Sequence, residues 1–476
     1  MKVNKFAILC LVIYAAVTIY FNYTHVMWFD EAHSWLIAKQ LGFVDMLKYI
    51  KNEGHFFVWQ VLLYPFAHVK FNLYPYAMKF LNWSFCMCAI IILWRKAPFN
   101  NWIKALITFS FPFLVCYSVL ARCYSIGILL LFALAALYEN KFKYPKTYAL
   151  LLILCANTSV MALIGATAFG ILFVVDVIKN KLPIKQIIIT LLILLIGAAA
   201  VLLQVIKINY FSTIVENGHF YTSLIMFENT YISNNLLVNS ILSLIFSIPV
   251  LIYLFRDKAS LFFFSFTYVL MLILAFNFYG MNFWHAYFFF VYLIISLRIN
   301  RAGKLLSGKF AHTALALISF LLIFNLPVKE NYNETLKSDC KIIKSFIEND
   351  ENLKNALILH NSGIMYEILP YRKKAAYKIK NYCTEKDNKD YDLKNLIGND
   401  CVRGNIFGQA QKYPDLIKSF VSDKTYAYTE KDKNIQVVNY GIIMAEDYQL
   451  LIKKYKCIEN HCFWKIEAIN ENAKSD

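Results

Sequence analysis

Residues 186–206 read QIIITLLILLIGAAAVLLQVI, a run without one charged side chain. A helix needs about 20 apolar residues to cross the ~30 Å hydrocarbon core of a bilayer. Similar runs occupy 6–21 and 261–278, and 59% of the 476 residues are hydrophobic. This pattern predicts a polytopic α-helical membrane protein. No small-residue cleavage site follows the first run, so we interpret it as a retained span and not as a signal peptide.

The formal net charge of +17 belongs mainly to the apolar part of the chain. Residues 1–326 contain 24 Lys and Arg but only 9 Asp and Glu, whereas residues 327–476 contain 24 and 22. Loops rich in Lys and Arg stay in the cytoplasm, so basic residues between apolar runs orient a membrane protein. We therefore assign the surplus to topology and expect no nucleic-acid partner.

Alternation of the apolar runs predicts about eleven transmembrane helices within a domain over 1–326. With the N-terminus inside, 17 basic residues lie on the cytoplasmic side and 7 outside, as the positive-inside rule requires. The expected spans are 6–21, 76–94, 105–120, 123–138, 147–157, 160–178, 186–206, 236–255, 261–278, 282–297 and 310–326.

Three segments of this domain lie at the outer face in the same scheme. The first outer loop is 22–55 and a second long outer loop is 207–235. Residues 56–70 are short for a crossing and contain Pro65, so we expect a helix that dips into the outer leaflet.

Residues 327–476 predict a small extracytoplasmic α/β domain. Strand patterns at 355–360 and 434–441 alternate with amphipathic helical patterns at 340–350 and 445–455. One or two disulfides are possible if this region lies outside the cytoplasm. The available cysteines are Cys340, Cys383, Cys401, Cys457 and Cys462.

Acidic side chains of the membrane region gather at the expected outer face. Six of the nine lie in the two outer loops, four of them in the first, and none lies at a span centre. Ion-coupled transporters usually keep ionisable residues at mid-membrane. The distribution favours chemistry at the outer surface over a transporter or lipid flippase. A non-catalytic scaffold that presents the C-terminal region is a second alternative.

The stretch WFDEAHSWLIA, residues 28–38, carries Asp30 and Glu31 soon after the first span. In a helix, Asp30 and His33 share one face and could hold a divalent metal ion. The simpler interpretation is that both acids are favourable charges in the first turn of an interfacial helix. The letters DEAH also spell a helicase motif, which we reject because the chain has no G-x-x-x-x-G-K-[ST] phosphate loop.

Two further stretches carry candidate phosphate ligands. NEGHFFVWQVLLYPF, residues 52–66, places His55 ahead of an apolar helix, where it could bind a phosphate, orient a carboxylate or be structural. SVLARCYSIG, residues 118–127, places Arg122 at an outer hairpin tip. An arginine there either snorkels to lipid phosphates or binds one phosphate through its guanidinium fork.

Together, WFDEAHSWLIA, EGHFFVWQVLLYPF and LARCYSIGILLLFALAALY resemble the C-type membrane glycosyltransferases. The resemblance is to the bacterial branch similar to lipid A aminoarabinose transferases and protein O-mannosyltransferases. It covers 6–140 and the remaining spans in outline; members commonly carry two prolines where this chain has Phe56 and Phe57. It implies transfer of a sugar from a polyprenyl-phosphate carrier to a lipid, glycan or protein acceptor, at the outer face of a bacterial inner membrane.

The resemblance also implies roles for individual residues. Asp30 matches the catalytic base and Arg122 the cation that holds the lipid phosphate; one displacement with one base inverts the anomeric centre. Glu31 is the second catalytic candidate and would hold the acceptor or a divalent cation; no cofactor is certain, and a divalent cation is possible. We add two donor-phosphate candidates, His55 and Lys207, and four substrate-binding candidates, His33, Glu53, Glu216 and His219. The 207–235 loop could close over the donor and exclude water.

Overall fold

The structure is a computed structural model of the whole chain. It describes residues 4–50, 55–179, 183–205, 248–277, 283–300, 306–323, 339–360, 367–371, 378–381, 422, 424–429, 440–444, 448–458 and 461–470. The chain divides into two compact units. Unit 1 comprises 1–25, 38–69 and 75–334, and unit 2 comprises 26–37, 70–74 and 335–476.

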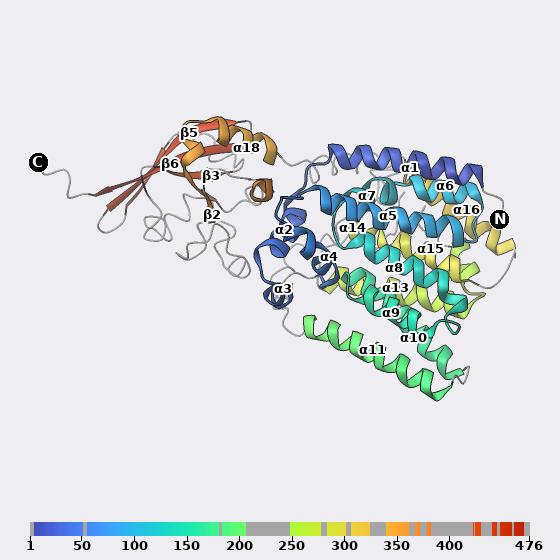
Figure 1. The fold of residues 1–476 in the computed structure, drawn as a ribbon. Helices are drawn as coiled ribbons and strands as arrows, with labels where there is room; N and C mark the ends of the chain where they lie inside the picture. The colour runs from blue at the N-terminus through green and yellow to red at the C-terminus, as the bar shows by residue number, and fades with distance from the viewer. Residues whose placement is uncertain are drawn as a thin grey trace, which may run out of the picture. The chain divides into compact units, whose positions relative to one another are not determined.

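Unit 1 is a bundle of apolar helices that lie side by side (Figure 1). Its longer helices are α1 (Lys5–Thr24), α5 (Tyr76–Lys96), α8 (Tyr124–Leu137), α9 (Pro145–Ala156), α10 (Val160–Lys179), α11 (Ile184–Val205), α13 (Lys258–Asn277), α15 (Phe288–Ile299) and α16 (Leu306–Leu321). Its shorter helices are α3 (Phe43–Tyr49), α4 (Val58–Ala67), α6 (Asn101–Phe109), α7 (Tyr117–Val119) and α14 (Phe283–Ala286).

Several of these helices are long and apolar enough to cross a membrane. Within the described residues there are five such helices, or six if a bent pair counts as one span, and five shorter apolar helices accompany them. The chain is therefore a multi-pass membrane protein, while the number eleven stays a prediction. The bent pair replaces the straight span expected over 105–120: Asn101–Phe109 and Pro112–Val119 meet at 54°. Pro112 has no N–H to continue the helical hydrogen bonding there.

Helix α4 agrees with the expectation of a segment that does not cross. It has ten residues and contains Pro65. At 1.5 Å per residue it is about 15 Å long, half of the hydrocarbon thickness.

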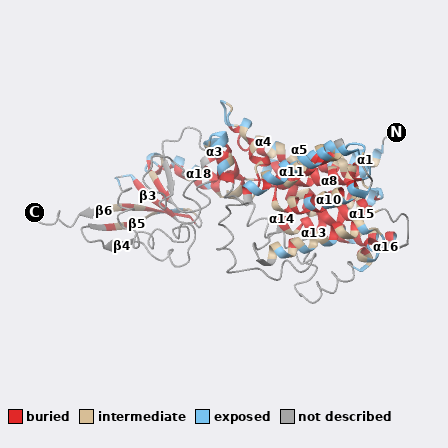
Figure 2. Ribbon diagram, turned by 90° about the horizontal axis from the view of Figure 1, so that it is seen from below, coloured by how far each residue is buried: buried red, intermediate tan, exposed pale blue. Residues whose placement is uncertain are grey.

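Buried side chains concentrate in the middle of the bundle, on α8, α10 and α15 (Figure 2). Close packing requires Gly165 of α10, because a Cβ there would lie 2.7 Å from a methyl carbon of Leu131 on α8. Helix α11 instead turns large apolar side chains outward, among them Leu195 and Ile196. Outward-facing leucine and isoleucine along a whole helix fit a hydrocarbon surrounding and not water.

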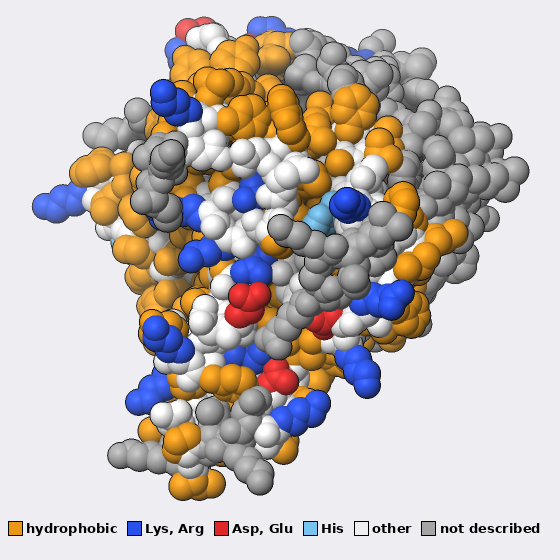
Figure 3. Space-filling view, turned by 90° about the vertical axis from the view of Figure 1, so that its right-hand side faces the viewer, with side chains coloured by type: hydrophobic (Ala, Val, Ile, Leu, Met, Phe, Trp, Pro, Cys, Tyr) orange, Lys and Arg blue, Asp and Glu red, His pale blue; other side chains and the backbone are white. Residues whose placement is uncertain are grey.

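Two ends of the bundle are distinguished by their side-chain contacts. At one, which we call the Lys141 end, Lys141 Nζ lies 2.8 Å from Asp176 Oδ2, and Arg298 lies 3.6 Å from Glu139. These pairs join the C-terminal ends of α8, α10 and α15, as the alternation of spans predicts. Figure 3 looks onto the side of the molecule where the N-terminus lies and shows many Lys and Arg side chains but few acids. Exposed basic residues near the helix ends there include Lys5, Lys96, Lys143, Lys179 and Lys309.

Unit 2 contains a six-stranded mixed sheet in the order β2-β1-β3-β6-β5-β4. The strands are β1 (Leu357–His360), β2 (Lys378–Asn381), β3 (Thr425–Thr429), β4 (Tyr440–Met444), β5 (Tyr448–Ile458) and β6 (His461–Asn470). β1 pairs in parallel with β2 and β3, and the other neighbours are antiparallel. The helix expected over 340–350 is confirmed as α18 (Cys340–Asn349), and the strand expected over 355–360 as β1.

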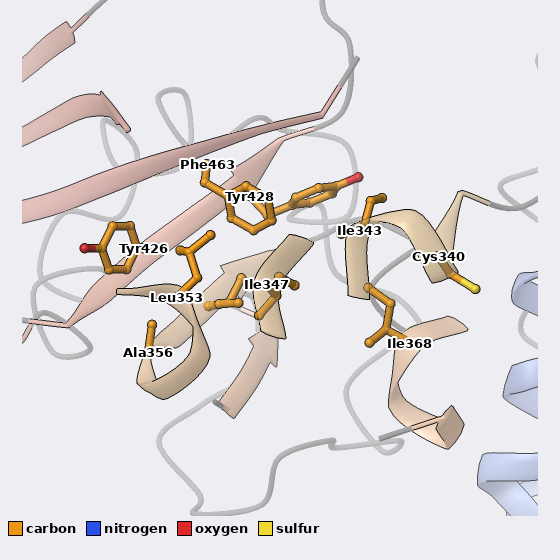
Figure 4. Close-up of a cluster of buried hydrophobic side chains, with 10 residues drawn as sticks. Cys340, Ile343, Ile347, Leu353, Ala356, Ile368, Tyr426, Tyr428 and Phe463 are labelled. Atoms are coloured by element: carbon orange, nitrogen blue, oxygen red, sulfur yellow. The ribbon is translucent and has the colours of Figure 1, made fainter. Parts of the chain in front are cut away.

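One hydrophobic core joins α18 to the sheet (Figure 4). It consists of buried side chains from α18, the following turn, β1 and the strands β3 and β6: Cys340, Ile343, Ile347, Leu353, Ala356, Ile358, Ile368, Tyr426, Tyr428 and Phe463. Cys457 and Cys462, opposite each other in the β5–β6 hairpin, form a disulfide.

The amphipathic helix expected over 445–455 is wrong, because Tyr448–Ile458 is the strand β5. Leu450 and Ile452 are buried and Lys453 is exposed, which is the alternation of a strand. The apolar run at 450–452 fits a helix or a strand by itself, and pairing with β4 and β6 decides the matter. The strand expected over 434–441 overlaps only the start of β4, and 434–439 lie outside the described residues.

Unit 2 also contains two segments from the N-terminal part of the chain, 26–37 and 70–74. Val26 packs against the core around α18. Asn72 donates a hydrogen bond of 2.8 Å to the Pro370 carbonyl. Most of helix α2 (Phe29–Gln40), which carries the acid pair, therefore belongs to the same compact unit as the C-terminal region.

Candidate functional site

Arg122 occupies the elbow between α7 and α8 in unit 1. Its backbone N–H donates to the Leu120 carbonyl at 2.8 Å, and α8 begins two residues later. The side chain is only 6% exposed. A snorkelling arginine keeps its guanidinium in water or among headgroups, so this burial favours the alternative of a charge held for a bound anion.

Two histidines and a tyrosine lie beside this elbow. The Tyr124 hydroxyl is 2.9 Å from His285 Nε2 and 3.5 Å from His55 Nε2. His55 also forms an isolated antiparallel bridge with Ser159, at the start of α10. The starts of α8 and α10 and the short helix α14 therefore meet at one end of the bundle, opposite to the Lys141 end; we call it the Arg122 end.

The hydrogen bonds indicate how these groups are protonated. The Trp284 indole N–H donates to His285 Nε2 at 3.0 Å, so that nitrogen carries a lone pair and the imidazole is neutral. Burial, followed by the charge of Arg122 and by His285, lowers the pKa of His55 well below its ordinary value. The Arg122 end thus presents one buried cation beside two neutral imidazoles and a phenol, a set suited to an anion with several oxygens.

Helix α2 positions the acid pair in unit 2. Glu31 is fully buried, and its Oε2 accepts a 3.0 Å hydrogen bond from the Trp28 backbone N–H. This contact is the N3-to-N-cap half of a capping box, so Glu31 has a structural role at the start of the helix. Asp30, one residue earlier, is half-buried. The interpretation of the acids as favourable charges in the first turn of a helix therefore applies to Glu31 more than to Asp30.

His33 lies one turn along the same helix, and its ring stacks on Phe29 with centroids 5.7 Å apart. In the described part of the chain, no three His, Cys, Asp or Glu side chains come together as a metal site. A divalent ion held by Asp30 and His33 stays a prediction and would need further ligands.

The structure brings His55 and Arg122 together, and it places Asp30, Glu31 and His33 on α2. Glu53, Lys207, Glu216 and His219 lie outside the described residues.

The sequence alone did not single out Tyr124, Trp284 or His285. Tyr124 stood in the quoted ARCY stretch, and a histidine at the start of an apolar span, as in FWHAY, was the available signal for His285.

No protein-family model matches the chain, and no curated protein matches it. Among solved structures, the chain is similar to the crystal structure of ArnT from Cupriavidus metallidurans bound to undecaprenyl phosphate. The sequence identity is 10%, the TM-score is 0.49, and the match covers 96% of this chain and 97% of that one.

Proposed function

We propose that the chain is an integral-membrane glycosyltransferase that moves a hexose or pentose from a polyprenyl-phosphate carrier to a lipid, glycan or protein acceptor. The observation that carries the proposal is the burial of Arg122 beside His55 and His285 at one end of an apolar bundle. A lipid phosphate that enters from the membrane surface would bring two or more charged oxygens next to this buried guanidinium, which binds phosphate through parallel hydrogen bonds.

The leaving group of the reaction explains the need for a cation. When the bond from the anomeric carbon to the phosphate oxygen breaks, negative charge grows on the lipid phosphate. A guanidinium binds two phosphate oxygens at once and stabilises that charge most in the transition state. His55 and the phenol of Tyr124 supply further polar contacts, and Lys207 is a further candidate.

Asp30 is the proposed general base. Its carboxylate would take the proton from the acceptor hydroxyl while the acceptor oxygen attacks the anomeric carbon, so one displacement inverts that centre. The capping contact of Glu31 favours Asp30 over its neighbour for this role. His33, Glu53, Glu216 and His219 stay candidates for substrate binding, and a divalent ion at Asp30 stays a candidate cofactor.

The proposed location is a bacterial inner membrane, with the Arg122 end and unit 2 facing away from the cytoplasm. The basic surplus between the spans supports this orientation. The Cys457–Cys462 disulfide supports it independently, because such bonds persist in oxidising compartments and are rare in the cytoplasm.

The test is an assay of the purified full-length protein in lipid nanodiscs with a panel of polyprenyl-phosphate sugars. We expect release of free polyprenyl phosphate from at least one donor, by transfer or by slow hydrolysis. Asp30→Asn keeps the shape of the side chain and removes its basicity, so turnover should fall by ~10²-fold or more with normal expression.

Near-wild-type turnover of Asp30→Asn would exclude Asp30 as the base. Movement of intact donor between leaflets, without cleavage of any donor in the panel, would support the flippase alternative instead.

A further inference from the structure

Helix α2 packs against a column of rings from two distant parts of the chain, residues 70–74 and the C-terminal region, all within unit 2. The Trp35 ring packs on Tyr74 with centroids 5.6 Å apart, and Tyr74 packs edge-on against Tyr371 at 4.8 Å. Tyr371 ends the short turn Leu369–Tyr371 that follows β1. A column of three aromatic rings thus connects α2 to the C-terminal region.

Further contacts lie just ahead of the helix. The Met27 backbone N–H lies near the Tyr371 hydroxyl, where it lowers the pKa of that group and partly offsets the effect of burial. The next residue, Trp28, donates its backbone N–H to Glu31. Asp30 lies between Trp28 and Glu31, so the position of its backbone depends on this contact.

The tyrosines remain protonated in this surrounding. Burial, followed by the neighbouring Tyr371 and Glu31, raises the pKa of Tyr74 well above its ordinary value. Burial and the nearby Cys340 raise the pKa of Tyr371 as well. Both hydroxyl groups therefore keep their protons at neutral pH and can serve as hydrogen-bond donors beside the buried Glu31 carboxylate.

We propose that the C-terminal region positions the catalytic base: Tyr371, with Tyr74, fixes helix α2 and thereby orients the Asp30 carboxylate. Tyr371 is a positioning residue in this scheme and need not touch substrate. The inference rests on the proposed function, and it gives the C-terminal region a role in the chemical step. A base displaced by about 1 Å can cost ~10²-fold in rate, so a contact that sets its position is expected to act on turnover.

The experiment compares Tyr371→Phe and Tyr371→Ala with the matched control Tyr455→Phe, in the full-length chain in nanodiscs. The Tyr455 hydroxyl contacts Asp350 and Asn352 in the same unit, at 3.0 and 2.8 Å, and is not part of the aromatic column. Two quantities are measured: kcat and donor KM with a donor that the wild-type enzyme uses, and hydrogen–deuterium exchange of residues 26–37.

We expect kcat to fall roughly 10-fold in Tyr371→Phe and further in Tyr371→Ala, with donor KM within about 2-fold of wild type. Exchange in 26–37 should accelerate in both variants, and Tyr455→Phe should change neither quantity. Unchanged kcat in both Tyr371 variants would overturn the inference, and so would an equal loss in the Tyr455 control, since that indicates general destabilisation.

Failure of the proposed function is recognised separately. It shows as a wild-type protein that cleaves no donor, and the role of Tyr371 in catalysis falls with it. The exchange data then still decide whether Tyr371 holds the start of α2.

Discussion

Arg122 shows how the surroundings of a single residue decide between two interpretations. At the tip of a hairpin, an arginine that anchors the protein to lipid headgroups and one that binds a substrate phosphate are equally plausible from the sequence. A side chain that is 6% exposed, next to His55 and His285, fits the second interpretation. The choice depends on burial, which the sequence does not contain.

Replacement of Arg122 by lysine tests the role of this residue, because lysine keeps the positive charge but lacks the planar guanidinium fork. A point ammonium cannot reproduce two parallel hydrogen bonds to one phosphate, so donor affinity should fall by about 10-fold or more in Arg122→Lys, and further in Arg122→Ala. Equilibrium binding of a polyprenyl-phosphate donor measures this. A lysine variant with wild-type affinity would assign Arg122 to anchoring, because either head group snorkels equally well.

His55 predicts a dependence of stability on pH. Its pKa is lowered in the folded protein, so folding favours the neutral imidazole. The free energy of unfolding therefore has its full value above the unfolded-state pKa of ~6.5. It falls as the pH drops below that value, by at most about 1.4 kcal/mol per pH unit. The Tm measured in detergent should therefore decline less steeply from about pH 7.5 to about 5.5 in His55→Gln than in wild type. Equal declines of Tm with pH in the two proteins would contradict the lowered pKa of His55.

At the scale of the element, helix α2 combines a structural acid with a candidate catalytic acid. The difference between the two roles depends on position in the first turn. The residue at N3 can reach back to the N-cap, and the residue at N2 cannot do so in the same way. Glu31, at N3, makes this contact.

The capping role of Glu31 predicts different effects of two substitutions. Glutamine preserves the contact to the Trp28 N–H, since both Glu and Gln serve at N3, so Glu31→Gln should retain turnover within about 3-fold. Glu31→Ala should lower the free energy of unfolding by about 1 kcal/mol and reduce turnover as well. Parallel measurements of unfolding and of sugar transfer compare the two. If glutamine were as damaging as alanine, the charge of Glu31 would matter and its catalytic role would return.

For strand β5, packing against neighbouring strands decides the conformation, and the local sequence pattern does not. Its sequence has an apolar run flanked by lysines, which suits a helix when considered alone. The neighbouring strand β6, with Trp464 and Ile466 buried opposite β5, makes the extended conformation the one that buries apolar surface.

At the scale of the whole molecule, side-chain contacts at the two ends of the bundle show in which direction the helices run. Ion pairs of Lys141 and Arg298 gather the ends of α8, α10 and α15 at one side, and the Tyr124–His285 contact gathers the starts of α8 and of the α14–α15 segment at the other. This agrees with the alternation of spans read from the charges.

The orientation of the chain in the membrane is tested with fusions. A fluorescent reporter that matures only in the cytoplasm should be inactive after Asp476, because the basic surplus keeps the Lys141 end inside. The same reporter fused after Lys146, at the Lys141 end, should be active and serves as the matched control. Strong fluorescence of the Asp476 fusion would place the Arg122 end and the acid pair on the cytoplasmic side.

The sequence by itself determined the class of protein, the direction of the helices, α18, β1 and the presence of an acid pair beside the first span. Each of these follows from apolar length, periodicity or charge asymmetry, which are properties of a local stretch and its solvent. Only the tertiary structure decided that Arg122 is buried, that Tyr124 meets His285 from 161 positions away, and that Glu31 caps a helix whose Trp35 packs in one column with Tyr74 and Tyr371. Such contacts depend on which distant elements pack together, and no local pattern encodes that packing.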